Sequence, residues 1–243
     1  MSSSKSRSVS DPTSKGSSSF LWVIVAVLAV AAVVIGLVVW QSQGQAASEL
    51  AERENTEVSA EMNYEGNTIT LAAPDANDPE QVDLFEDFSC GYCAQLAQNT
   101  DQQMLEEIEN GNLAVTIHPM NFMDNGNEGH STSAAAATLA LADKGETEAY
   151  WNLREILFED QQDIFNQWDD DDFANAAEAV GASSEAVDAI RDGEYKDRAN
   201  EVGKSNAETM QDAVGEVSTP RVMQDGEDVS VTDINSWIDE VLA

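Results

Sequence analysis

Apolar residues are distributed in two different ways along the chain. Residues 20–40 form an uninterrupted run without a charged or strongly polar side chain, and a helix of this length rises about 30 Å, the thickness of a membrane's hydrocarbon core. Trp22 and Trp40 lie near its ends, where aromatic rings favour the membrane interface. From about residue 64 onward, apolar positions follow short strand and helix periods. The pattern predicts one transmembrane helix followed by a mixed α/β domain.

The N-terminal run is interpreted as an uncleaved anchor, with a cleaved signal peptide as the alternative. The apolar core of a signal peptide is about 7–15 residues long, and Ala46 and Ala47 make only a weak cleavage site. Cations precede the run, whereas the charged residues after it are mainly acidic. The positive-inside bias then predicts a disordered cytoplasmic tail at residues 1–19 and an extracytoplasmic linker at residues 41–63. We expect a single-pass protein of the cell membrane.

The domain predicted at residues 64–243 begins with alternating strand and helix patterns. A helix is expected after Cys93, where apolar positions recur at helical spacing until Asn110 and Gly111, a common helix-ending pair. Apolar segments rich in β-branched residues flank it on both sides. The predicted order is strand, strand, helix, strand, with the strands at residues 68–71, 82–88 and 113–117.

Helical periodicity dominates residues 124–214, where no strand is convincing. This block is expected to be a helical insertion in a smaller α/β fold. A β-hairpin around Gly226 and a final helix capped by Asp233 then complete the domain. The helical segments of the insertion are predicted at residues 133–142, 147–158, 173–180, 184–190 and 195–214.

Charge excludes one class of partner. The chain has 46 acidic and 11 basic residues, a formal net charge of −35. Such a surface repels phosphate backbones, so nucleic-acid binding is excluded. The acid excess is explained either by solubility alone or by adaptation to high salt. A run of acids at Asp169–Asp172 lacks the glycine and the final glutamate of a calcium loop and is interpreted as a solvated helix start.

Cys90 and Cys93 are the only cysteines of the chain, and they lie at the predicted strand-to-helix junction. A Cys-x-x-Cys pair at such a junction is typical of a thioredoxin-like redox site. Cys90 is expected at the helix N-terminus, where free N–H groups and the helix dipole favour a thiolate. Cys93, one turn later, is expected to face the core and to resolve a mixed disulfide.

Two structural interpretations of the cysteines remain alternatives. A disulfide that closes so short a loop would stabilise the fold by only about 2 kcal/mol, so it makes a poor brace. Zinc binding would need His118 and His130 as further ligands. These histidines lie farther apart in the sequence than the second ligand pair of most zinc modules. Redox chemistry is the favoured interpretation.

The run from Glu86 to Cys93, the helical block and the Ser218-Thr219-Pro220 segment together resemble the DsbA family, particularly its membrane-anchored members in Gram-positive bacteria. The resemblance covers residues 64–243. It implies a thioredoxin-like α/β fold with an inserted α-helical domain, and no bound cofactor or metal. It also implies a role for each site residue: Cys90 is the nucleophile, Cys93 resolves, Pro220 is the cis-proline, and Thr219, Gly91 and Tyr92 contact the substrate.

The sequence departs from that family at two places. The pair Gly91-Tyr92 brings no cation next to Cys90, and Leu84 occupies the position where thioredoxin-like proteins often bury an acid. Glu86 and Asp87 are the nearer candidates for moving the proton of Cys93. Strand alternation places their side chains on opposite faces, so at most one is expected to face Cys93. The alternative is that both are solvated residues at a strand end.

The sequence therefore predicts a membrane-tethered, extracytoplasmic thiol–disulfide oxidoreductase. The favoured direction is oxidation of thiols in exported proteins, with a membrane oxidase as the recycling partner. Two alternatives are a reductase or isomerase of the same fold and a non-catalytic acidic binding module, chaperone-like in character, with an inert disulfide.

Overall fold

The computed structural model describes residues 23–31, 33, 50 and 53–243. The predicted tail at residues 1–19 and most of the predicted anchor and linker lie outside these residues. The chain divides into two units, residues 1–46 and 47–243. In the first unit, residues 23–31 and 33 are helical. Within the part of the chain that the structure describes, no helix is both long enough and apolar enough to cross a membrane.

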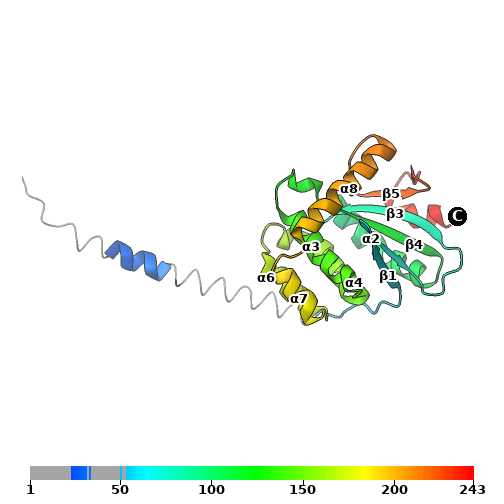
Figure 1. Cartoon of the computed structure of the whole chain (residues 1–243). Helices are drawn as coiled ribbons and strands as arrows, with labels where there is room; N and C mark the ends of the chain where they lie inside the picture. The colour runs from blue at the N-terminus through cyan, green and yellow to red at the C-terminus, as the bar shows by residue number, and fades with distance from the viewer. Residues whose placement is uncertain (1–22, 32, 34–49, 51–52) are drawn as a thin grey trace, which may run out of the picture. The chain divides into compact units, whose positions relative to one another are not determined.

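The second unit is built on a six-stranded sheet with the order β1-β2-β4-β3-β5-β6 (Figure 1). The central strands β3 and β4 are parallel, and every other neighbouring pair is antiparallel. The parallel pair requires a crossover, which α2 (Gly91–Glu109) supplies. The strands are β1 (Glu61–Glu65), β2 (Thr68–Ala72), β3 (Glu80–Asp87), β4 (Leu113–Met120), β5 (Arg221–Gln224) and β6 (Glu227–Asp228).

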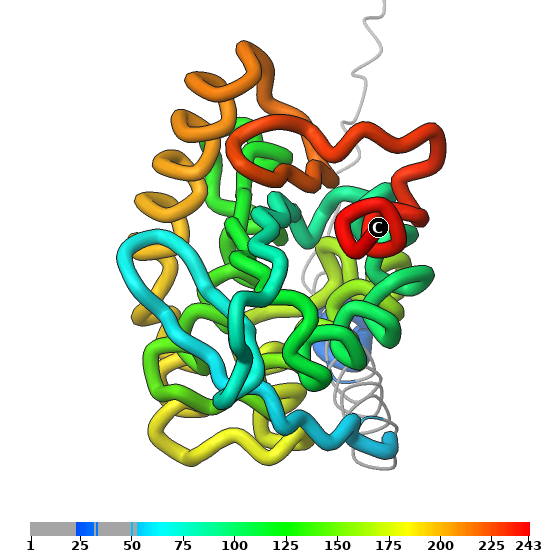
Figure 2. The backbone as a smooth tube through the Cα atoms, turned by 90° about the vertical axis from the view of Figure 1, so that its right-hand side faces the viewer, coloured from blue at the N-terminus to red at the C-terminus, as the bar shows by residue number. Residues whose placement is uncertain are grey.

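Helices between β4 and β5 form the insertion, and Figure 1 shows α3, α4, α6 and α7 grouped beside the sheet. Two short elements follow β6, and Figure 2 shows the last of them, α9, beside α2. The insertion comprises η1 (Phe122–Asp124), α3 (His130–Asp143), α4 (Thr147–Glu159), α5 (Gln161–Ile164), α6 (Asp170–Ala179), α7 (Ser184–Arg191) and α8 (Lys196–Val214), and the C-terminal elements are η2 (Ile234–Ser236) and α9 (Trp237–Val241).

The sheet has an apolar layer on each face. Leu84 of β3 and Phe88, the residue after the strand, belong to the larger core, which also contains side chains of α2, α4 and α9. Phe85, pointing the other way, packs with Met120 and with Met210 of α8. Because successive residues of a strand point to opposite faces, β3 separates α2 from α8. The same alternation separates the side chains at its end, including Glu86 and Asp87.

Most elements of the predicted α/β fold are confirmed, and the differences have local causes. β1 begins at Glu61, inside the segment expected to be linker, because it pairs with β2 along its length across a turn at Gly66, where φ is +57°. β4 continues beyond the expected end at Ile117, because its pairing with β3 extends to Met120. The four-residue helix α5 was not predicted. The acidic run at Asp169 is a helix start with a capping box, as expected.

Candidate active site

The two cysteines lie where β3 ends and α2 begins. Cys90 is the residue that caps α2, and its N–H donates to the carbonyl of Asp87 at 2.9 Å. The N–H of Cys93 donates to the Cys90 carbonyl at 3.0 Å. Both side chains are free thiols and both are buried, with exposed fractions of 6% for Cys90 and 2% for Cys93. The structure therefore describes the reduced form, with the predicted helix-terminal placement of Cys90.

The two thiols have opposite acidities. The pKa of Cys90 is lowered to about 5, although burial opposes the shift. The largest cause is a hydrogen bond from the Cys93 thiol, and smaller contributions come from the Thr219 hydroxyl and the N–H groups of Cys93 and Tyr92. Burial, and then the neighbouring Cys90, raise the pKa of Cys93 well above its usual value. At neutral pH Cys90 is a thiolate and Cys93 is a protonated thiol. Cys90 is therefore suited to nucleophilic attack, and Cys93 stays unreactive until it loses its proton to resolve the mixed disulfide.

The loop before β5 forms the opposite wall of the site. The Thr219–Pro220 peptide bond is cis, which confirms the geometry implied by the family resemblance. The Cys90 thiol donates to the main-chain carbonyl of Thr219, with a sulfur–oxygen distance of 3.3 Å. While Cys90 is protonated, the buried Thr219 hydroxyl has no hydrogen-bond partner; once Cys90 loses its proton, the hydroxyl can donate to the thiolate, which is how it lowers the pKa of Cys90.

Between the cysteines, Gly91 and Tyr92 face solvent. Tyr92 is 75% exposed and is one of the few large apolar side chains of the domain at the surface. Beneath them lies Gln161 of α5, whose buried Nε2 donates to the carbonyls of Phe88 at 2.7 Å and Cys90 at 3.2 Å. Gln161 thus holds the turn that leads into α2. No sequence signal indicated it, because it belongs to a helix too short to show a periodic pattern.

Glu86 is fully buried, so the interpretation of this residue as solvated is wrong. Its carboxylate receives two hydrogen bonds from Arg154 of α4, at 2.8 and 2.7 Å. The same guanidinium donates to Asp101 of α2 at 2.5 Å and lies over the rings of Trp151 and Phe158. Paired hydrogen bonds between a guanidinium and a carboxylate are strong and fix the position of both groups. Glu86 is therefore a structural anion that ties β3 to the insertion.

Asp87 is also buried, and its surroundings differ from those of Glu86. Its carboxylate accepts hydrogen bonds from the Ser131 hydroxyl at 2.5 Å and from the N–H groups of Ser89 at 2.9 Å and Met123 at 3.1 Å. Burial raises the pKa of Asp87 to about 6, and the nearby Asp124 carboxylate adds to the shift. No ion pair of the described residues includes Asp87. It can therefore change its protonation state near neutral pH.

The two histidines have separate surroundings. His118 stacks on Phe85, and its ring nitrogens contact Asp83 at 2.7 Å and Asn206 at 3.4 Å. His130 begins α3 and packs edge-on against Phe165. Among the residues that the structure describes, no group of three or more Cys, His, Asp or Glu side chains is arranged to hold a metal ion. The contacts of these histidines give the zinc interpretation no support.

Comparison with known proteins identifies the family. A family model described as thioredoxin matches residues 65–240. The chain belongs to the thioredoxin family. Its fold is similar to that of MdbA, a thiol-disulfide oxidoreductase from Corynebacterium diphtheriae, with a TM-score of 0.76, 37% identity, and coverage of 79% of this chain and 98% of that one. MdbA from Corynebacterium matruchotii gives a TM-score of 0.77 and 35% identity, over 81% and 98% of the two chains.

These similarities make this thioredoxin-family protein an enzyme of the MdbA and DsbA type, a thiol–disulfide oxidoreductase. A Mycobacterium tuberculosis DsbA structure, 20% identical with a TM-score of 0.55 over 75% of this chain and 90% of that one, shares the fold. The serine/threonine-protein kinase PknE of the same species is 25% identical over 138 residues, 54% of this chain. The chain spans about a quarter of the length of that curated relative, 24%.

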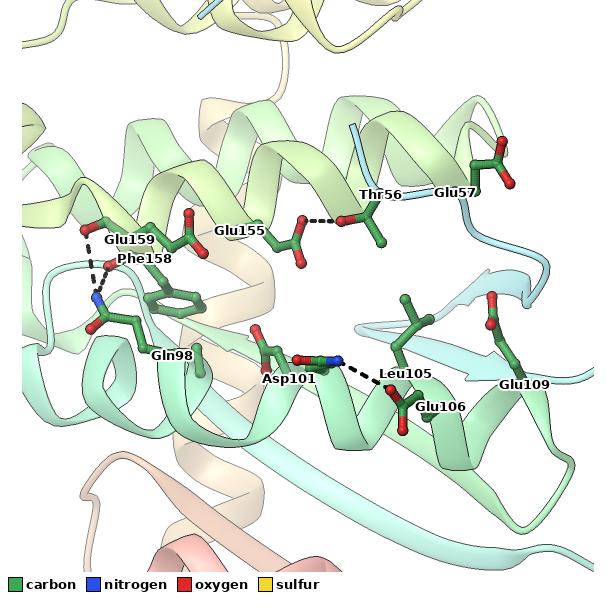
Figure 3. Close-up of a pocket in the computed structure, with 12 residues that line it drawn as sticks. Thr56, Glu57, Gln98, Asp101, Leu105, Glu106, Glu109, Glu155, Phe158 and Glu159 are labelled. Carbon is green, nitrogen blue, oxygen red and sulfur yellow. Dashed lines mark hydrogen bonds between the residues drawn. The ribbon is translucent and has the colours of Figure 1, made fainter. Parts of the chain in front are cut away.

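A groove of about 460 Å³ lies on the same thioredoxin-family domain, between α2 and α4. Figure 3 shows Glu155 and Glu159 on one side and Asp101, Glu106 and Glu109 on the other, with the Phe158 ring projecting between the two helices near Gln98. Its lining includes neither cysteine of the redox pair. The groove is therefore an acidic surface feature of the domain and is separate from the dithiol.

Proposed function

We propose that this oxidoreductase acts as an oxidase and passes the Cys90–Cys93 disulfide to newly exported proteins. The observation that carries the proposal is the hydrogen-bonded environment of Cys90, which lowers the pKa of its thiol to about 5. Stabilising a thiolate stabilises the reduced protein, and a disulfide with a stabilised reduced form is a stronger oxidant. The Cys93 thiol, followed by Thr219 and the N–H groups of the helix terminus, supplies this stabilisation, although the side chains between the cysteines bring no cation.

The reaction proceeds by two exchanges. A substrate thiolate attacks Cys90 Sγ; the bond between the two cysteines breaks, and Cys93 leaves as a thiolate that takes up a proton. A second substrate thiolate then attacks the substrate sulfur of the mixed disulfide, so the substrate becomes oxidised and Cys90 leaves as a thiolate. The enzyme is now reduced by two electrons. A membrane oxidase would return it to the disulfide form.

Asp87 is the proposed proton partner of Cys93. The Cys93 sulfur is almost inaccessible to solvent, and a main-chain hydrogen bond with Asp87 favours its thiolate, although burial raises the pKa of the thiol overall. The Asp87 carboxyl group titrates near neutral pH, as an acid–base group should. Glu86 is less suited to this role because Arg154 holds its carboxylate in two hydrogen bonds.

An exposed apolar surface supports a polypeptide substrate. Tyr92, Met123 and Phe165 are 75%, 42% and 43% exposed. Tyr92 lies between the cysteines, Met123 donates its N–H to Asp87, and Phe165 follows α5, which holds the Cys90 turn through Gln161. Unfolded chains present apolar side chains that such a surface binds. The Thr219 main chain would add backbone hydrogen bonds to the substrate.

The proposed location is the outer side of a cell membrane. The uncharged run at residues 20–40, preceded by cations and followed by acids, supports a single-pass anchor with the N-terminus in the cytoplasm. Tethering would keep the domain close to a membrane oxidase and to proteins emerging from export. An oxidising compartment would also maintain the disulfide.

The test is whether the enzyme oxidises or reduces its substrates. Equilibration with glutathione is expected to give a reduction potential more oxidising than about −200 mV, and the oxidised protein should form disulfides in a reduced, unfolded substrate. Cys90→Ser should abolish this activity, and Cys93→Ala should trap substrates as mixed disulfides at Cys90. A potential near that of thioredoxin, about −270 mV, would instead assign the reductase role. If the Cys90→Ser variant retained activity, neither oxidation nor reduction of substrates could proceed through Cys90 as proposed.

A further inference from the structure

We propose that Ser131 and Ser89 form a proton relay that connects the buried Asp87 carboxyl group to solvent. The relay would serve the Cys93 thiol each time the disulfide forms or breaks. This inference rests on the proposed function, in which Asp87 exchanges a proton with Cys93. It assigns a role in the reaction to a residue of the helical insertion.

The hydroxyl groups form a continuous chain. Ser131 Oγ lies 2.5 Å from Asp87 Oδ1 and 2.7 Å from Ser89 Oγ. A hydroxyl group has one hydrogen to donate, so Ser131 cannot donate to both partners at once. With Asp87 ionised, the consistent arrangement is Ser89 donating to Ser131 and Ser131 donating to the carboxylate. This arrangement passes protons inward to Asp87, and outward transfer from a protonated Asp87 follows once both hydroxyl groups have rotated to point toward solvent.

Burial makes such a chain necessary. Asp87 and Ser131 have exposed fractions of 0%, and Cys93 has 2%. Bulk water therefore has no direct contact with the carboxyl group or with the resolving sulfur. Ser89 is partly exposed, so it is the point at which the chain reaches solvent. A proton released by Cys93 to Asp87 can leave the interior through the two hydroxyl groups.

The start of α3 is built to hold Ser131 in place. Asp124 accepts hydrogen bonds from the N–H groups of Ser131 at 3.2 Å and Thr132 at 2.8 Å, which fixes the first turn of the helix. A Cβ atom at residue 129 would lie 2.6 Å from an Asp124 oxygen, so the glycine there leaves room for this carboxylate. Ser131 is thereby positioned with its hydroxyl above Asp87 and its N–H on Asp124.

The charged groups around Asp87 are consistent with this role. Asp124 of η1 faces it with a like charge and raises the pKa of Asp87. From α2, the Cys90 thiolate and the Cys93 thiol share the same end of β3. From α3, His130 is buried, which lowers its pKa, so it is neutral at neutral pH. None of these groups is a cation that would compete for the Asp87 carboxylate.

The proton balance can be followed during formation of the disulfide. With a chromogenic aromatic disulfide as the oxidant, Cys90 thiolate attacks one sulfur, a mixed disulfide forms, and the first aromatic thiolate leaves. Cys93 then gives its proton to Asp87 and attacks Cys90 Sγ, and the second aromatic thiolate leaves. The Asp87 proton moves to Ser131 while the Ser131 proton moves to Ser89, and Ser89 releases one to water. Two electrons pass from the dithiol to the reagent.

The experiment is stopped-flow detection of the two aromatic thiolates released by the reduced full chain, which has only two cysteines. The first phase reports Cys90, and the second reports proton loss and attack by Cys93. In Ser131→Ala the second phase is expected to slow by about tenfold or more, with the first phase unchanged, and its inflection near pH 6 should move to higher pH because the hydrogen bond lost in this variant lowers the pKa of Asp87 in the wild type. Ser89→Ala should change the second phase in the same direction by a smaller factor, because water can enter at the surface.

Thr138→Val is the matched control. Thr138 is another buried hydroxyl of α3, but it donates only to the carbonyls of Ala134 and Ala135 of its own helix. Its removal tests the general effect of losing a buried hydroxyl from α3, and both phases should match the wild type. Ser131→Thr, which keeps a hydroxyl, should recover most of the second-phase rate.

Specific outcomes would overturn the relay. If the second phase of Ser131→Ala kept the wild-type rate and pH profile, Ser131 would have no part in proton transfer. If that variant failed to fold, Ser89→Ala would decide the question by the same criterion. In the wild type, the second phase should show a bowed dependence on the deuterium fraction of the solvent, and a linear dependence would contradict transfer of several protons. A wild-type chain without a first phase would instead exclude the proposed function itself.

Discussion

At the scale of single residues, the site contains two pairs of chemically similar groups whose surroundings give them different acidities or partners. Cys90 and Cys93 are both thiols, but the Cys93 thiol and other hydrogen-bond donors lower the pKa of Cys90, whereas burial raises the pKa of Cys93. Glu86 and Asp87 are both buried carboxyl groups. Arg154 neutralises the first, whereas the second has only neutral donors and keeps the energetic cost of its burial. At neutral pH, Cys90 is therefore the thiol that can attack as a thiolate, and Asp87 is the carboxyl group that can gain or lose a proton.

Asp87→Asn is expected to stabilise the protein at neutral pH. The pKa of Asp87 is raised from 3.8 to about 6, so the folded state binds a proton more tightly than the unfolded state and loses stability as pH rises through this window. Two pKa units correspond to about 3 kcal/mol at pH 7. The amide nitrogen cannot accept from Met123 N–H, so we expect a net gain of about 1–2 kcal/mol in the free energy of unfolding.

Urea unfolding at about pH 4 and pH 7 measures this effect. The gain should disappear near pH 4, where the wild-type carboxyl group is already protonated. Asp212→Asn, at an exposed position of α8, is the control and should change stability little at either pH. A loss of stability in Asp87→Asn at pH 7 would show that the hydrogen bonds of the carboxylate outweigh its burial.

At the scale of elements, the insertion is joined to the sheet by buried polar groups as well as by apolar packing. Arg154 of α4 binds Glu86 at the end of β3 and Asp101 in the middle of α2. Gln161 of α5 and Ser131 of α3 contact the turn that carries Cys90. Each contact requires the insertion helices at defined positions relative to β3. The insertion therefore takes part in shaping the dithiol site.

Arg154→Met is expected to destabilise the protein by about 3–5 kcal/mol, because it leaves two buried carboxylates without their partner. Denaturant unfolding near neutral pH is the measurement. Replacing the carboxylates as well, with Glu86→Gln and Asp101→Asn, should recover part of the loss. Arg191→Met removes an exposed arginine with surface ion pairs and should cost less than about 1 kcal/mol. Similar losses for the two arginine variants would contradict the role of burial.

At the scale of the whole molecule, charge is the dominant property. The formal net charge is −35, and most ion pairs of the described residues involve at least one well-exposed partner. The groove between α2 and α4 brings several acidic side chains together on one surface (Figure 3). Repulsion among them opposes folding at low ionic strength and is screened as salt is added.

The melting temperature of the full chain is expected to rise by roughly 5 °C or more between low and molar sodium chloride. A variant with Glu57, Glu106, Glu109 and Glu155 of the groove changed to Gln should start from a higher value and respond less to salt. Differential scanning calorimetry gives both quantities. A melting temperature that stays constant or falls with salt would count against charge repulsion and against adaptation to high salt.

The sequence by itself determined the features that depend on local order. The spacing of Cys90 and Cys93, their place between a strand and a helix, the helical periods of the insertion and the final hairpin all arise from neighbouring residues. The cis geometry at Pro220 was indicated only through family resemblance. Strand alternation also correctly separated Glu86 from Asp87 onto opposite faces of β3.

The tertiary structure decided which environment each side chain has. Glu86 meets Arg154, Asp87 meets Ser131, and the Cys90 turn meets Gln161, all across separations of more than forty residues. Burial and pairing set the pKa values and hence the roles of these carboxyl groups. Such contacts depend on which helices pack against which strand, and periodicity along a single segment carries no information about them.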